Sequence, residues 1–224
     1  MHIVTLSFDD GFRKSNLKIA EIYERFGLSA CMNVLAGPVI EEQERWGADR
    51  GDFDLWNQLQ ARGHEIMPHG YDHSNKRELG FEKAKASILR CLDVFAEKLD
   101  GFTPASAVFN FPFNQSTPEL EAWLPTVVRA FRTSGGGLNA VPSPATVKLT
   151  TTGWGPDNCE WHLTEQVELL MTEPEGWLVY NTHGLDDEGW GPIRASYLEM
   201  LLERLVHAGV RVLPAARVLA EAGG

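Results

Sequence analysis

The chain has 224 residues, of which 43% are hydrophobic, and a formal net charge of −11. An acidic surface repels phosphate groups, so nucleic acid and anionic membranes are poor candidate partners. The three cysteines are odd in number and far apart, which favours free thiols in a reducing compartment over a disulfide framework. Length and composition suit one domain over residues 1–224.

Apolar or β-branched runs alternate with helical periods along the whole chain. Repeated strand–helix units imply a parallel sheet with right-handed crossovers, and seven or eight units in one domain favour a barrel over an open sheet. The glycine run at 135–137 and the proline-rich stretch at 142–144 are predicted to form one loop. Strands are predicted at 3–8, 30–35, 64–67, 105–111, 127–132, 146–151, 177–182 and 210–213. Helices are predicted at 14–26, 54–62, 81–99 and 195–208, from Ser116 onward, and over 167–171 with Thr164 as a cap.

Polar residues with catalytic potential follow several of the predicted strands. In a parallel barrel all these strand ends lie at one rim, which is where barrel enzymes place their chemistry. Residues more than a hundred positions apart are therefore expected to share one pocket. The residues concerned are Asp9, Asp10, His69, Asn110, Phe113 and His183.

Asp9-Asp10-Gly11, taken alone, is typical of a turn. Here a helical pattern follows it, and two adjacent ionised carboxylates repel each other unless a cation or proton compensates. His69 and His73 are one helical turn apart, so both imidazoles share a face if the segment turns helically. Carboxylate and imidazole ligands that converge on one point, with a spare carboxylate to accept a proton, indicate a metal-assisted hydrolase.

His183, taken alone, is typical of a hydrogen-bonded structural histidine. The segment that follows it, 184–192, is either a solvated acidic loop or a loop that faces substrate and closes over it as a lid. Trp190 is flanked by glycines within this segment, and it has the best claim to a substrate contact because aromatic faces stack on sugar rings.

Together these residues resemble the polysaccharide deacetylase family of carbohydrate esterases. Ser7-Phe8-Asp9-Asp10-Gly11 matches the T-F-D-D-G motif, with Ser in place of Thr, and His69 and His73 match the H-x-x-x-H motif. Asn181-Thr182-His183 takes the place of the late L-x-H motif, without its Leu. The resemblance implies an α/β fold, a distorted (β/α) barrel of about seven strands that is similar to a TIM barrel.

The resemblance also implies site roles. One divalent metal ion, zinc, would be held by Asp10, His69 and His73. Asp9 would be the general base and His183 the general acid.

The third family motif, R-P-P-Y-like, departs from its pattern here and reads Asn110-Phe111-Pro112-Phe113. Asn110 replaces an arginine that steadies the base, so Asp9 is expected to lose an orienting contact and a charge that lowers its pKa. Phe113 replaces the tyrosine and can still supply a backbone N–H. Asn110, Phe113 and Trp190 are assigned to substrate binding. The fourth motif is unclear, and Asp157 or Glu160 would stand in for the aspartate that tunes the histidine.

The expected function is metal-dependent removal of an N-acetyl or similar acyl group from an amino sugar or glycoconjugate, by hydrolysis of an amide that is not a peptide bond. Two alternatives stay open. One is the same machinery acting on a non-sugar amide such as a cyclic ureide or imide. The other is a catalytically silent barrel that binds metal and carbohydrate, which the Asn110 replacement motivates and the retained Asp9 opposes. No signal peptide is visible, so a cytoplasmic location and a small soluble substrate are expected; a chain whose leader had been removed would look the same.

Overall fold

A computed structural model describes residues 1–39 and 49–223. Its central strand, β1 (His2–Phe8), is buried from Ile3 onward. A strand covered on both faces needs a nearly continuous apolar run, and the N-terminal sequence supplies one. β1 pairs in parallel with β2 (Cys31–Val34) and β8 (Gly176–Thr182). β3 (Glu65–Pro68) extends the sheet beside β2, also in parallel.

Three further parallel strands form a second sheet in the order β4, β5, β7. They are β4 (Val108–Asn110), β5 (Ala130–Ser134) and β7 (Lys148–Thr151). Two short strands join the first sheet. β9 (Arg211–Val212) pairs with β1, and β6 (Leu138–Asn139) pairs antiparallel with β8.

The two sheets meet to form the wall of a barrel. Backbone hydrogen bonding continues from β7 to β8, because the Thr152 carbonyl accepts a hydrogen bond from Asn181 N at 3.0 Å and Thr152 forms an isolated bridge with Tyr180. Between β3 and β4 no ladder forms among the described residues. Asn110 Nδ2 instead donates to the Pro68 carbonyl at 3.4 Å. The predicted α/β fold with a distorted barrel of about seven parallel strands is confirmed, and its wall is open between β3 and β4.

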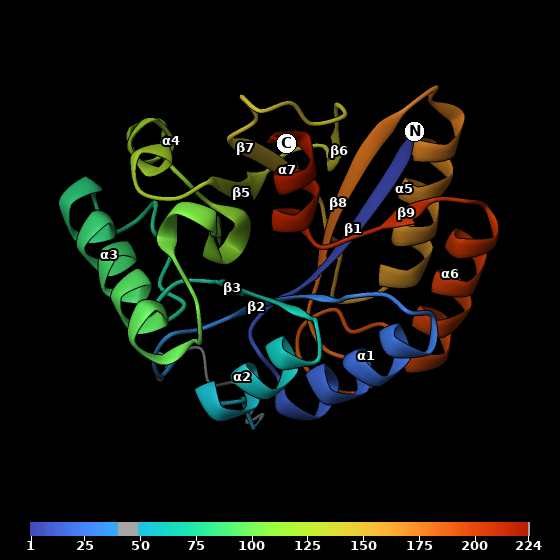
Figure 1. Cartoon of the computed structure of the whole chain (residues 1–224), viewed down its shortest axis with the longest axis horizontal. Helices are drawn as coiled ribbons and strands as arrows, with labels where there is room; N and C mark the ends of the chain where they lie inside the picture. Colours follow the sequence, from blue (N-terminus) through green and yellow to red (C-terminus); the bar gives the residue numbers. More distant parts are fainter. Residues whose placement is uncertain (40–48, 224) are drawn as a thin grey trace.

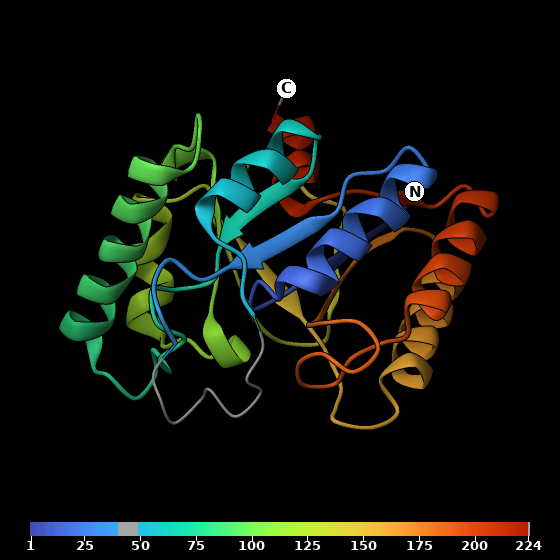
Figure 2. The ribbon, with the colours of Figure 1, turned by 90° about the horizontal axis from the view of Figure 1, so that it is seen from below.

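Helices surround the strands on the outside (Figures 1 and 2). The last helix, α7 (Ala215–Gly223), lies instead across the N-terminal ends of the strands, where its Val218 and Leu219 are buried in a cluster with Ile3 and Trp177. No helix in the described ranges has the length and apolarity that a bilayer crossing needs. The outer helices are α1 (Arg13–Arg25), α2 (Phe53–Ala61), α3 (Phe81–Lys98), α4 (Pro118–Trp123), α5 (Cys159–Thr172) and α6 (Ala195–His207). Short 3-10 helices lie at Pro104–Ser106, Pro112–Asn114 and Leu124–Thr126.

Two predicted elements need correction. Thr164 does not cap α5, because the helix begins earlier, at Cys159, and the Thr164 hydroxyl donates to the Glu160 carbonyl one turn back. The predicted loop around residues 135–144 contains β6, because Leu138 and Asn139 reach the edge of β8 and pair with it.

Candidate active site

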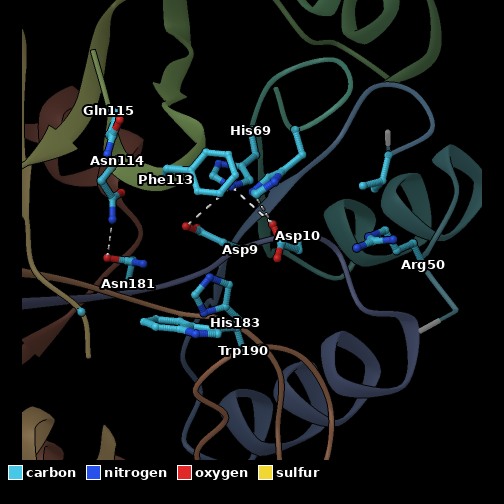
Figure 3. Close-up of a pocket in the computed structure, with 13 residues that line it drawn as sticks. Asp9, Asp10, Arg50, His69, Phe113, Asn114, Gln115, Asn181, His183 and Trp190 are labelled. Atoms are coloured by element: carbon cyan, nitrogen blue, oxygen red, sulfur yellow. Dashed lines mark hydrogen bonds and ion pairs between the residues drawn. The ribbon is translucent and has the colours of Figure 1, made fainter. Parts of the chain in front are cut away.

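A pocket of about 690 Å³ opens at the carboxyl ends of the strands, and seven residues singled out in the sequence line it (Figure 3). They come from loops after four different strands, so the barrel brings together positions up to 181 residues apart, from Asp9 to Trp190. The seven are Asp9, Asp10, His69, His73, Phe113, His183 and Trp190. The remaining lining residues are Val39, Arg50, Asn114, Gln115, Gly153 and Asn181.

Asp10, His69 and His73 form a cluster whose ligand atoms all lie within 4.8 Å of one another. Asp10 Oδ1 is 3.4 Å from His69 Nε2 and 3.2 Å from His73 Nε2. Yet Asp10 Oδ1 is buried and has no hydrogen-bond partner of good geometry. Two atoms that each bind one ion at about 2.1 Å in tetrahedral geometry lie roughly 3.4 Å apart. The orphaned oxygen and the spacing therefore fit one small divalent cation.

The protonation states in this cluster also suit metal binding. Burial lowers the pKa of His73 to about 4, so its imidazole is neutral at pH 7. Burial alone would raise the pKa of Asp10, but the imidazoles of His69, His73 and His183 hold it well below its ordinary value. His69 Nδ1 lies 3.0 Å from the Asn110 carbonyl oxygen. Its Nδ1–H donates to that carbonyl, which directs Nε2 as an acceptor toward Asp10.

Asp9 is 2% exposed and is held by Arg132, a residue of β5. Arg132 Nη1 donates to Asp9 Oδ1 at 2.8 Å, and Nη2 donates to Oδ2 at 2.6 Å. Asn33 adds a third hydrogen bond at 2.8 Å. Burial alone would raise the pKa of Asp9, but the charge and hydrogen bonds of Arg132, with His69 nearby, hold it below its ordinary value. The expectation that Asp9 lacks an orienting positive partner is wrong.

Asn110 is not at the pocket surface, so its assignment to substrate binding is also corrected. Its side chain is 3% exposed and donates to Asn33 Oδ1 at 2.9 Å. Because Asn33 in turn holds Asp9, Asn110 lies one layer beneath the pocket floor. Asparagine is too short to reach Asp9 from there, whereas Arg132, its paired residue on the neighbouring strand, reaches it directly.

His183 lies across the pocket from His69 in Figure 3, and the edge of its ring faces Trp190 with the ring centroids 5.5 Å apart. Its Nδ1 is buried and has no hydrogen-bond partner. The expectation that Glu160 tunes this histidine is not met, because both Glu160 carboxylate oxygens accept hydrogen bonds from Arg194. Because His183 Nδ1 has no hydrogen-bond partner in the described ranges, Asp157 does not tune the histidine through this atom either.

Two partly exposed aromatic rings flank the pocket. Phe113 is 47% exposed, and its ring centroid lies 4.6 Å from that of His73. Trp190 is 39% exposed and covers Gly155, where a Cβ would come within 2.8 Å of the indole.

The backbone at the pocket is strained. Six non-glycine residues among those described have a positive φ, and four of them line the pocket. Such conformations cost energy and cluster at functional sites, because the surrounding structure has to hold them. The four are Asp10, His73, Phe113 and Asn114.

The segment 184–192 is fastened to α1. Ser15 N and Oγ both donate to Glu188 Oε2, at 2.9 and 2.5 Å, and Leu185 N donates to Ser15 Oγ at 2.8 Å. An isolated bridge joins Leu185 and Ile193 at the base of the segment. These anchors indicate that the segment is a fixed wall of the pocket, which presents Trp190, and not a mobile lid.

Comparison with known proteins agrees with this geometry. A family model described as polysaccharide deacetylase matches residues 1–126. A search of curated protein sequences finds no match. The Xyl-CE4 domain of a multidomain xylanase from the hindgut metagenome of Trinervitermes trinervoides superposes with a TM-score of 0.66 at 12% identity, covering 99% of this chain and 91% of that one.

Two further solved structures are similar. A family 4 acetyl xylan esterase from Clostridium thermocellum, in complex with a cobalt ion, gives a TM-score of 0.61 at 17% identity, covering 98% of this chain and 91% of that one. A peptidoglycan deacetylase from Bacillus subtilis gives 0.59 at 15%, covering 97% and 89%. These likenesses show a shared fold. The family model spans 126 of the 224 residues, including the Asp-Asp and His-x-x-x-His segments, and the chain belongs to the polysaccharide deacetylase family.

Proposed function

We propose that this protein removes an N-acetyl or similar acyl group from an amino sugar, by hydrolysis that depends on one divalent cation, most simply zinc. One observation carries the proposal. A buried carboxylate, Asp9, is held as an anion by Arg132 directly beside a separate cluster of one carboxylate and two imidazoles. A purely metal-binding site has no need of the first carboxylate, whereas hydrolysis needs a group to accept the proton of the attacking water.

Asp10, His69 and His73 would hold the cation. When bound, it would supply Lewis acidity, which makes an attacking water more acidic and an acyl carbonyl more electrophilic. The neutral state of His73 and the orientation of His69 Nε2 toward Asp10 prepare these side chains for that role.

Asp9 would accept the proton of the attacking water. Its low pKa keeps it ionised at neutral pH, and its hydrogen bonds to Arg132 and Asn33 fix its orientation. His183 would donate a proton to the departing amine. Two groups in opposite protonation states on the two sides of the reacting bond are the arrangement that acid–base hydrolysis requires. The backbone N–H of Phe113 would stabilise the oxyanion.

The experiment measures acetate release by the zinc-loaded protein from N-acetylated sugars and, separately, ring opening of a cyclic imide as the non-sugar amide. Asp9→Asn should keep the metal and lose about 10²–10⁴-fold in turnover, since that is the usual contribution of a general base. Asp93→Asn is the matched control, because Asp93 is an exposed carboxylate on α3.

Turnover of the imide alone would replace the sugar deacetylase with the ureide-type activity. Full turnover by Asp9→Asn would remove Asp9 from the mechanism. A protein that binds zinc and sugar yet releases no acyl group would be the silent barrel.

A further inference from the structure

One positively charged side chain of the pocket, that of Arg50, has no part in the proposed chemistry. Arg50 lines the pocket, and in Figure 3 it lies on the far side of Asp10 from Asn114 and Asn181. Its backbone forms an isolated antiparallel bridge with Phe12, and its guanidinium carbon lies 5.4 Å from the centre of the Phe12 ring. The backbone and the guanidinium of Arg50 are therefore both positioned by Phe12, the N-cap residue of α1.

The carboxylates nearest to Arg50 along the chain are already paired with another arginine. Arg13 Nε lies 3.1 Å from Asp49 Oδ2, and Arg13 Nη2 lies 2.9 Å from Asp52 Oδ2. Within the described ranges no ion pair involves Arg50, and its Nε is buried without a hydrogen-bond partner. A buried guanidinium N–H without an acceptor is costly unless a ligand supplies one.

The other charged pocket residues that the structure describes do not neutralise Arg50. Among the lining residues that the structure describes, only Asp9 and Asp10 are acidic. Asp9 is committed to Arg132, and Asp10 to the imidazoles of His69 and His73. Among the described residues no carboxylate compensates the charge of Arg50, in a protein whose net charge is −11. The acidic protein surface repels anions in general, so a positively charged side chain at the pocket favours the entry of an anionic ligand.

We propose that Arg50 binds an anionic group, a carboxylate or a phosphate, carried by the acylated sugar. The substrate class is then an acidic N-acyl amino sugar or an N-acyl amino sugar phosphate, and this assignment rests on the proposed function. A guanidinium presents paired N–H donors that match the two oxygens of a carboxylate or phosphate. The asparagines and Gln115 on the other side of Asp10 are left to meet the neutral hydroxyl groups.

The test is calorimetric binding of three probes to the zinc-loaded protein. The probes are N-acetylglucosamine, N-acetylmuramic acid and N-acetylglucosamine 1-phosphate. The wild-type protein should bind one acidic probe about tenfold to a hundredfold more tightly than the neutral sugar, as expected for a charge-assisted hydrogen bond, and the tighter of the two identifies carboxylate or phosphate. Arg50→Gln should lose that preference, even if the acidic group of the probe also contacts the bound zinc ion.

Arg217→Gln is the matched control, because Arg217 is an exposed arginine on α7 whose side chain makes a single hydrogen bond, to Ser29 at 3.4 Å. It should keep the preference. Zinc content and the thermal midpoint show that each variant is folded. Equal binding of neutral and acidic probes, a preference that survives in Arg50→Gln, or no measurable binding of any probe would overturn the assignment.

Acetate release by the wild-type protein is measured on the same three sugars, which separates the two proposals. Release without a binding preference would leave the deacetylase proposal intact and remove the role of Arg50. An Arg50-dependent binding preference without any acetate release would keep the role of Arg50 and remove the deacetylase proposal.

Discussion

Arg132 and Asn110 occupy paired positions on the neighbouring strands β5 and β4, and both support the floor of the pocket. Arg132 holds Asp9 directly, and Asn110 holds it through Asn33. In the family motif the arginine stands at the position of Asn110. In this chain the arginine stands instead at the paired position on β5. Both positions face the inside of the barrel, so the guanidinium of Arg132 still reaches the carboxylate of Asp9.

Removing this guanidinium should impair catalysis in a specific way. Arg132→Asn leaves Asp9 buried without its charged partner, so the pKa of Asp9 rises. The base is then protonated at higher pH, and the acidic limb of the kcat/KM profile should move to higher pH while turnover falls by at least about tenfold. A pH–rate profile measures both effects. If Arg132→Asn had wild-type turnover and an unchanged acidic limb of the kcat/KM profile, the role of Arg132 would be contradicted.

Restoring the family pattern should rescue this loss. The double variant Asn110→Arg/Arg132→Asn places the guanidinium back on β4, facing the same carboxylate. It should recover part of the turnover and return the acidic limb toward its original pH, whereas Asn110→Arg alone places a second cation in a filled space. A double variant no better than Arg132→Asn would show that the two positions are not interchangeable.

The cluster of Asp10, His69 and His73 could be predicted from the sequence because these residues belong to two short motifs. The sequence did not predict Arg132, which is 123 residues from Asp9 and belongs to no motif. A signal was nevertheless present, since Arg132 ends a predicted apolar strand at 127–132. A charged residue on a buried strand needs a partner, and Asp9 was the carboxylate in need of one.

At the scale of elements, every predicted strand and most predicted helices have a counterpart within a few residues. Periodicity finds such elements because a strand or helix buried on a fixed face must repeat its apolar residues. β6 and α7 were missed for different reasons. β6 has two residues and exists only because β8 offers an edge. α7 has nine residues, as many as α2, so its length did not hide it, and its position at the chain end left it unassigned.

His64 joins three elements, and its protonation should control their packing. Its Nδ1 accepts a hydrogen bond from Ala30 N at 3.1 Å, and its Nε2 lies 3.2 Å from Glu24 Oε1. Burial lowers the pKa of His64 below its ordinary value of 6.5. As the pH falls below 6.5 the unfolded chain binds a proton that the folded protein does not bind, so the free energy of unfolding decreases toward acid.

His64→Gln should therefore flatten this dependence. Urea unfolding at pH 7.5 and pH 5.5 should show a smaller loss for the variant, with a difference of up to about 1.4 kcal/mol per pH unit. His207→Gln, which changes an exposed histidine at the end of α6, should behave as the wild type. Parallel pH dependences in wild type and His64→Gln would show that His64 titrates equally in both states.

For the whole molecule, the two ends of the barrel have separate roles. The carboxyl ends of the strands carry the pocket, while α7 packs its Val218 and Leu219 over the opposite end. Leu219→Ala should cost about 2–5 kcal/mol in the free energy of unfolding, because it leaves a cavity at a fully buried position. kcat and KM at 25 °C should not change. Leu169→Ala, at an exposed position of α5, is the control, and an altered KM in Leu219→Ala would show that the ends are coupled.

The size of the pocket bears on the size of the substrate. A volume of about 690 Å³ between Phe113 and Trp190 suits one or two sugar rings. We therefore propose a small acylated substrate. Rates on N-acetylated chitin oligomers should not rise steeply with chain length. A steep rise in kcat/KM, with no activity on single rings, would favour a polymer and leave the deacetylase proposal untouched.

The dependence of deacetylation on one metal ion is tested most directly by reconstitution. Protein stripped of metal by a chelator is titrated with zinc while acetate release from an N-acetylated sugar is followed. Activity should be absent at the start, rise with added zinc and saturate at about one equivalent per chain, and His69→Ala should bind zinc far more weakly. Full acetate release by the stripped protein, or saturation that His69→Ala leaves unchanged, would contradict the account.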